Sequence, residues 1–186
     1  MRPRVAERLG LGLEEFEERW FGELSEMREI GPLVDALRAF DPSPEVAEEV
    51  ASLRRAVTQQ GLVPAPGALE TIAELRARGF LIGLITVCTD DVPALWPETA
   101  FHGLFDAEIF SCSVGLRKPD PRIYLLACEQ LGVEPGEALF VGDGANDELA
   151  GAERVGMTAV LIERPGEEQD WLGRRIHSLQ ELLTLV

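Results

Sequence analysis

The sequence has few cysteines, little positive charge and no long apolar run. Its three cysteines, Cys88, Cys112 and Cys128, lie far apart without a CxxC pair, so we expect reduced thiols rather than a disulfide framework. Only 17 Lys and Arg oppose 33 Asp and Glu, which argues against a nucleic-acid partner because bound phosphates require basic side chains. No apolar stretch approaches the roughly 20 residues of a membrane span, and Met1–Gly10 lacks the apolar segment of a signal peptide. We therefore expect a cytoplasmic protein without a membrane or nucleic-acid partner.

The first third of the chain has a helical pattern. With 186 residues, the chain suits one domain or a core with a small accessory unit. Between Leu13 and Gln60 apolar residues recur at the spacing of one helix face. One such set is Phe16, Trp20, Leu24 and Met27. The texture changes near residue 62, so residues 1–62 are predicted to form a helical domain and residues 63–186 a second domain.

The second part alternates short apolar runs with helical segments. The predicted strands are Phe80–Thr86, Ala107–Cys112, Ala138–Val141 and Thr158–Ile162. The predicted helices are Ala68–Arg78, Pro121–Leu131 and Ala145–Val155. Continuous apolar strands that alternate with helices indicate a parallel sheet covered on both faces. The fold class is therefore α/β, a Rossmann-like three-layer arrangement, and polar residues at the strand ends are the first candidates for a site.

Two carboxylates follow the third predicted strand. The run VGDGAND (residues 141–147) places Asp143 and Asp147 four residues apart at a junction between a strand and a helix. Carboxylate oxygens are the ligands that Mg²⁺ prefers, so the pair predicts a metal site. The alternative is a helix N-cap, where Asp is favoured for its backbone hydrogen bonds alone.

Lys118 and Thr86 are candidates for binding a phosphate. Lys118 lies in LRKPDP (residues 116–121), where Asp120 and Pro121 predict the start of a helix. An ammonium beside a helix N-terminus can hold an anion, although a solvated loop lysine is the alternative. Thr86 closes a predicted strand and can donate to a phosphoryl oxygen or merely cap the strand end. Replacement of Lys118 by Ala is expected to remove anion binding and to leave the fold intact.

Together these segments resemble the second, third and fourth motifs of the haloacid-dehalogenase (HAD) superfamily. The phrases VGLRKPDPRIY and FVGDGANDELAGA carry the resemblance, and residues 1–62 resemble its C1-type helical cap. The resemblance implies a Mg²⁺-dependent phosphatase of small phosphorylated metabolites, with dehalogenation as the other hydrolytic option. Thr86 would hydrogen-bond the transferring phosphoryl group, and Lys118 would neutralise it and orient the nucleophile. Asp143 would ligate Mg²⁺, while Asp147 would hold the water shell of the metal.

The sequence departs from the family in its first motif, an apolar strand that ends in DxD. No two aspartates of this chain are separated by one residue, so no nucleophile can be assigned. We therefore expect a truncated, inactive hydrolase that binds Mg²⁺ weakly, with a non-catalytic binding module or one part of a split enzyme as the alternatives. The strands ending in Thr86 and Asp143 would flank the missing strand. They should either pair directly or accept a strand from another chain, in a homodimer or from a strand-donating partner.

Two of the cysteines lie near the predicted site. Cys88 and Cys112 each follow or close a predicted strand. We interpret them as buried reduced thiols, with a redox or catalytic role as the alternative.

Overall fold

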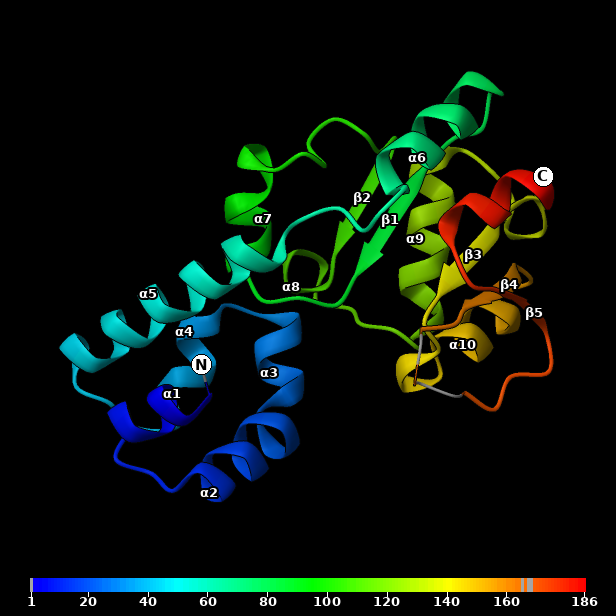
Figure 1. Cartoon of the computed structure of the whole chain (residues 1–186). Helices are drawn as coiled ribbons and strands as arrows, with labels where there is room; N and C mark the ends of the chain where they lie inside the picture. Colours follow the sequence, from blue (N-terminus) through cyan, green and yellow to red (C-terminus); the bar gives the residue numbers. More distant parts are fainter. Residues whose placement is uncertain (1, 165, 167–168) are drawn as a thin grey trace. The chain divides into compact units, whose positions relative to one another are not determined.

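The computed structural model describes residues 2–164, 166 and 169–186, and it divides the chain into two compact units (Figure 1). The helical unit comprises Met1–Val63, Thr86–Ala100 and Phe110–Gly115. The α/β unit comprises Pro64–Ile85, Phe101–Ile109 and Leu116–Val186. The helical unit thus recruits two segments from later in the chain, beyond the 1–62 boundary predicted from sequence. The role of residues 1–62 as a cap stays a prediction.

One long helix and several short ones make up the helical unit. They are α1 (Arg2–Arg8), α2 (Leu13–Glu18), a π-helical turn (Arg19–Glu23), α3 (Ser25–Ile30), α4 (Leu33–Arg38), α5 (Pro44–Gly61), α7 (Asp91–Leu95), a 3₁₀ turn (Trp96–Glu98) and α8 (Ser111–Val114). The helical pattern predicted between Leu13 and Gln60 is confirmed. Helix α5 has a local start signal, because the Ser43 side chain accepts a hydrogen bond from the backbone N–H of Val46 and Pro44 follows Ser43. Helix α1 was not predicted.

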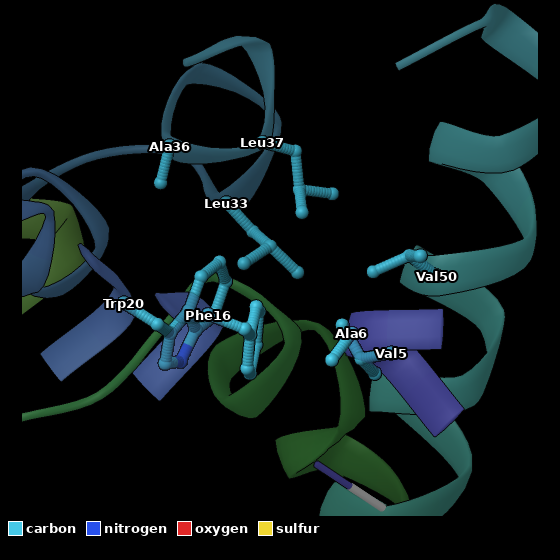
Figure 2. Packing of buried hydrophobic residues seen from close by; sticks show 8 residues of the cluster. All are labelled: Val5, Ala6, Phe16, Trp20, Leu33, Ala36, Leu37 and Val50. Atoms are coloured by element: carbon cyan, nitrogen blue, oxygen red, sulfur yellow. The ribbon is translucent and has the colours of Figure 1, made fainter. Parts of the chain in front are cut away.

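One apolar cluster forms the core of this unit, and Figure 2 shows its side chains pointing toward one another. Its members are Val5, Ala6, Phe16, Trp20, Leu33, Ala36, Leu37 and Val50. The rings of Phe16 and Trp20, four residues apart, stack with centroids 5.5 Å apart. Burial of each large apolar side chain contributes about 1.5–3 kcal/mol. Met27 was predicted to lie on the same helix face as Phe16 and Trp20, but it is 44% exposed.

Polar contacts attach the Thr86–Ala100 segment to the helical unit. Arg54 donates to the Thr89 hydroxyl at 2.8 Å and lies 3.8 Å from the Asp91 carboxylate. The backbone N–H of Leu33 donates to the Asp90 carboxylate at 3.1 Å. Asp91 is buried, so its pairing with Arg54 and with the hydroxyls of two threonines offsets the cost of desolvating its charge.

Among the residues that the structure describes, the α/β unit has five short strands and the helices between them. Its elements are α6 (Ala68–Ala77), β1 (Gly83–Thr86), β2 (Ala107–Phe110), α9 (Pro121–Leu131), β3 (Leu139–Gly142), α10 (Glu148–Arg154), β4 (Thr158–Ile162) and β5 (Arg174–Ile176), with 3₁₀ turns at Pro135–Glu137, Ala145–Asp147 and Leu179–Thr184. The last residues of β1 and β2, Thr86 and Phe110, belong to segments of the helical unit.

The strands form two sheets rather than the single sheet predicted. Strands β3, β4 and β5 form a parallel sheet in that order, with Val141 opposite Val160 and Ile162 opposite Ile176. Strands β1 and β2 pair separately. Within the described residues no ladder joins β1 to β3, so the first of the two expected alternatives, direct pairing of these strands, is wrong, and the second, a strand from another chain, stays a prediction. The parallel α/β class is confirmed for β3–β5.

Two of the predicted elements have the observed limits, whereas the boundaries of several others need correction. Helix α9 and strand β4 have the predicted limits. Strand β1 begins at Gly83 rather than at Phe80, because Phe80 and Leu81 are 43% and 53% exposed and precede the ladder. The run predicted to extend to Cys112 ends at Phe110, after which α8 begins. The helix predicted from Ala145 starts as a 3₁₀ turn and becomes α-helical at Glu148, and β5 was not predicted.

No helix among the described residues has the length and apolar character needed to cross a bilayer.

Candidate active site

A strained turn connects β3 to α10. Gly144 has φ 83°, and the next left-handed residues are Asn146 (φ 52°) and Asp147 (φ 56°). Left-handed backbone costs roughly 1–2 kcal/mol for an ordinary L-residue, and Gly, Asn and Asp tolerate it best. Residues held in such conformations cluster at functional sites, where the surrounding structure compensates for their cost. The GDGAND sequence therefore has the residue types that this turn requires.

Glu148, the first residue of α10, lies beneath this turn. Its side chain is only 4% exposed, and it forms an ion pair with Lys118. Its other carboxylate oxygen accepts a hydrogen bond from the Gly144 backbone N–H at 3.2 Å. A Cβ atom at Gly142 would lie 2.2 Å from this carboxylate, so only glycine leaves room for it. The sequence reasoning missed Glu148, although an acid immediately after the turn and at the start of a helix was a possible signal.

Lys118 is not a solvated loop residue. Its side chain is 17% exposed, and the ammonium lies 5.6 Å from the centre of the Phe140 ring in addition to its contact with Glu148. It is also the only lysine in the chain. The structure thus contradicts the solvated-loop alternative, while a role in binding phosphate stays a prediction.

Tyr124 connects α9 to the start of α10. Its hydroxyl donates to the Glu148 carbonyl oxygen at 2.8 Å. Burial, together with the nearby Glu148 carboxylate, raises the pKa of Tyr124, so its phenol stays a neutral donor. A Cβ at Gly151 would lie 2.6 Å from this hydroxyl. Close packing of the two helices therefore fixes the backbone that carries Glu148.

Asp143 forms an ion pair that the sequence did not reveal. One carboxylate oxygen lies 2.9 Å from the Arg164 guanidinium, and the other accepts from the Ala145 N–H at 3.2 Å. Arg164 follows β4 and has no motif around it, so only the fold places it beside Asp143. Asp147 is exposed and occupies the N-cap position of α10, but its side chain makes no capping hydrogen bond there. The N-cap alternative therefore does not explain Asp147.

The carboxylates here do not make a complete metal site. The described residues contain no group of three His, Cys, Asp or Glu side chains that could hold a metal ion. Of the predicted ligands, Asp143 is engaged by Arg164 and Asp147 lies at the surface. Mg²⁺ requires near-octahedral oxygen coordination, much of it from water when protein ligands are few. The residues present therefore do not fit a closed Mg²⁺ site, and no chemical step is assigned to the metal.

Thr86 is the last residue of β1 and is partly buried. It is also the first residue of a segment that belongs to the helical unit, whereas Lys118, Asp143 and Asp147 belong to the α/β unit. The structure connects Lys118 through Glu148 to Gly144, the residue after Asp143. The convergence of Thr86 with these residues stays a prediction.

A protein-family model that describes haloacid dehalogenase-like hydrolases matches residues 4–156 of this chain. The chain belongs to this family. It is 35% identical to a phosphatase of Mycobacterium tuberculosis (strain CDC 1551 / Oshkosh), over 94% of this chain and 84% of the relative. It is 32% identical to a glyceraldehyde 3-phosphate phosphatase of Methanopyrus kandleri, over 70% of this chain and 56% of the relative. It is also 32% identical to an (S)-2-haloacid dehalogenase of Burkholderia cepacia, over 65% of this chain and 54% of the relative.

The fold of the chain also matches solved structures of this family. A HAD phosphatase from Thermococcus onnurineus has a TM-score of 0.73 at 29% identity, over 99% of this chain and 85% of that one. The chain spans little more than half of the archaeal phosphatase and of the dehalogenase that it resembles in sequence. The relatives therefore include both hydrolytic types within one family.

Proposed function

We propose that the chain forms the larger part of a HAD phosphomonoesterase that acts on small phosphorylated metabolites. The observation that carries the proposal is the buried pair of Lys118 and Glu148 beneath the GDGAND turn. An ammonium has three N–H donors, and one is directed to Glu148. The others can contact a phosphoryl oxygen, while Glu148 keeps the ammonium in place. The phosphatases among the relatives support this reading.

The charges at the turn favour a phosphate only together with a cation. Lys118 and Arg164 bring two positive charges, whereas Asp143, Asp147 and Glu148 bring three negative ones. Such a site repels a bare phosphate dianion unless a cation offsets the carboxylates. In this proposal Asp143 and Asp147 would hold Mg²⁺ only weakly, because Arg164 competes for the Asp143 carboxylate, and the cation would supply the positive charge that offsets the carboxylates.

Catalysis requires an attacking carboxylate that these 186 residues do not supply. The sequence has no DxD pair, and covalent phosphoryl transfer cannot proceed without a nucleophile, however well the phosphate is held. Among the described residues, β1 pairs only with β2, and β3 pairs only with β4. An added strand could pair with these free edges by β-augmentation and bring its carboxylates to the ends of β1 and β3. We propose that a segment outside the 186 residues, in the same or another polypeptide, provides it.

The test is hydrolysis of a generic phosphomonoester with Mg²⁺, with and without a synthetic peptide that carries an apolar strand ending in DxD. The chain alone should show no turnover above background. The peptide should restore turnover, and a matched NxN peptide should not. Turnover by the chain alone that Asp143→Ala abolishes would show that it contains its own nucleophile. Failure of the DxD peptide, despite its binding, would favour a non-catalytic binding module.

Dehalogenation is the second candidate because the Burkholderia cepacia relative is a dehalogenase. The Asp143–Arg164 ion pair favours this option, since the part of the chain that the structure describes has no cluster of carboxylates ready for a metal. Halide release from a 2-haloacid by the peptide-complemented chain without Mg²⁺ would support dehalogenation. Phosphate release that requires Mg²⁺ would support the phosphatase.

A further inference from the structure

Two cysteines that are 24 positions apart in the sequence lie together in the helical unit. The sulfur atoms of Cys88 and Cys112 are 3.9 Å apart. Cys88 follows the end of β1 by two residues, and Cys112 lies in α8, immediately after β2. All three cysteines of the chain are free thiols, but the third, Cys128, lies in α9 of the α/β unit.

A buried serine next to Cys112 is hydrogen-bonded to the backbone of Cys88. The Ser111 hydroxyl accepts a hydrogen bond from the Cys88 backbone N–H at 2.9 Å and donates to the Glu29 carbonyl oxygen. Ser111 is fully buried and precedes Cys112 in the chain. The Ser111 hydroxyl therefore joins the Cys88 backbone to the residue that precedes Cys112, so the approach of the two thiols does not depend on their side chains alone.

We propose that Cys88 and Cys112 form a reversible intramolecular disulfide that ties the segment after Thr86 to α8. An S–S bond is about 2.05 Å long, so the sulfurs must approach by roughly 2 Å. Rotation about the Cα–Cβ bonds can bring the two sulfur atoms closer together. The inference does not depend on the function proposed above, because it rests on the positions of the two thiols.

The difference in exposure between the two thiols determines which of them is oxidised first. Cys112 is partly exposed, whereas Cys88 is 9% exposed. Burial raises the pKa of the Cys88 thiol, and the neighbouring Cys112 raises it further, so Cys88 stays protonated and does not react first. With hydrogen peroxide as oxidant, the Cys112 sulfur takes one oxygen, the O–O bond breaks, and one water leaves. The Cys88 sulfur then attacks the Cys112 sulfenic acid, the S–O bond breaks, and the hydroxyl leaves as a second water with the Cys88 proton.

The experiment treats the whole chain with a small excess of hydrogen peroxide and measures its intact mass, its remaining thiols and its disulfide-linked peptides. The wild type should lose the mass of two hydrogens and retain one of three thiols. Peptide mapping should link Cys88 to Cys112, and dithiothreitol should reverse the change. Cys128→Ser is the matched control and should form the same disulfide. In Cys88→Ser, oxidation should stop at a Cys112 sulfenic acid that dimedone traps.

Three results would overturn the proposal. One is a wild-type protein that keeps all three thiols under conditions that oxidise a free cysteine peptide. Another is a wild-type protein in which Cys112 sulfenic or sulfinic acid accumulates without a disulfide. The third is a disulfide between two copies of the chain, visible as a dimer on a non-reducing gel. Because the main measurement is the peptide map of the oxidised wild-type protein, the test does not require any variant to fold.

Discussion

Strands β4 and β1 have similar apolar sequences but different surroundings. Strand β4 pairs with β3 on one side and with β5 on the other, and its Val160 and Leu161 have no exposed surface. Strand β1 pairs with β2, and none of its residues is fully buried. Strand β4, which has a neighbour on both sides, is thus buried more completely than β1, although β2 is also largely buried with β1 as its one partner among the described residues. The partial exposure of β1 fits a strand that has space for a neighbour.

The largest effect is expected at the ion pair beneath the turn after β3. Lys118→Ala leaves the Glu148 carboxylate buried without a counter-ion, which should cost about 3–5 kcal/mol of unfolding free energy. This revises the sequence-based expectation that the substitution leaves the fold intact. Urea denaturation should show the loss, and Glu148→Gln in the same chain should recover most of it. An unchanged midpoint for Lys118→Ala alone would mean that Glu148 is not buried as described.

A matched pair of substitutions compares the two strands directly. Leu161→Ala in β4 removes a fully buried side chain and should cost about 2–4 kcal/mol. Leu84→Ala in β1 removes a partly exposed side chain and should cost only about 1 kcal/mol. Chemical denaturation of both variants measures the difference. Equal losses would show that β1 is covered as completely as β4.

A smaller effect is expected at the start of α9, whose cap does not depend on either strand. The Asp120 carboxylate accepts from the Arg122 N–H and side chain, and these hydrogen bonds lower the pKa of Asp120. Asp120→Ala should cost about 1 kcal/mol near neutral pH. Because the folded pKa lies below the unfolded value, the stabilisation is complete above the unfolded pKa and is lost as pH falls through the folded pKa. Thermal melts at neutral and acidic pH should therefore differ between wild type and Asp120→Ala only at neutral pH.

The smallest effect concerns the exposed ion pair of Asp143. The Arg164 side chain is 61% exposed, so its contact with Asp143 contributes little to stability. Arg164→Ala should instead strengthen Mg²⁺ binding by a few-fold, since an ion pair of at most about 1 kcal/mol no longer competes for the carboxylate. Isothermal titration with Mg²⁺ measures this. Arg122→Ala is the matched control and should not change the affinity, and weaker binding in Arg164→Ala would exclude the competition.

Local signals predicted the elements that depend on local chemistry. Helix α9 has Asp120 and Pro121 at its start and Gly132 at its end, and its limits were predicted to the residue. Strand β4 was also predicted, because its apolar run ends where its ladder ends. Strand β1 was predicted too long, since Phe80 and Leu81 are apolar but lie before the ladder. Apolar sequence alone does not say where a partner strand begins.

The site was predicted less completely because its contacts join distant parts of the chain. Lys118 and the GDGAND turn were found from their motifs. Their partners were not, since Glu148 lies 30 residues from Lys118 and Arg164 lies 21 residues from Asp143. The approach of Cys88 to Cys112 likewise depends on the pairing of β1 with β2. Spacing along the sequence carries no signal for such pairs.

Hydrogen–deuterium exchange of the strand amides, with and without the DxD peptide, tests the central claim most directly. In the chain alone, β4 amides should exchange slowly, whereas the β1 amides that do not bond to β2 should exchange fast. The peptide should slow these β1 amides and the amides of β3 that do not bond to β4, and it should leave β4 unchanged. Protection of β1 equal to that of β4 in the chain alone, with no response to the peptide, would contradict a free strand position between β1 and β3.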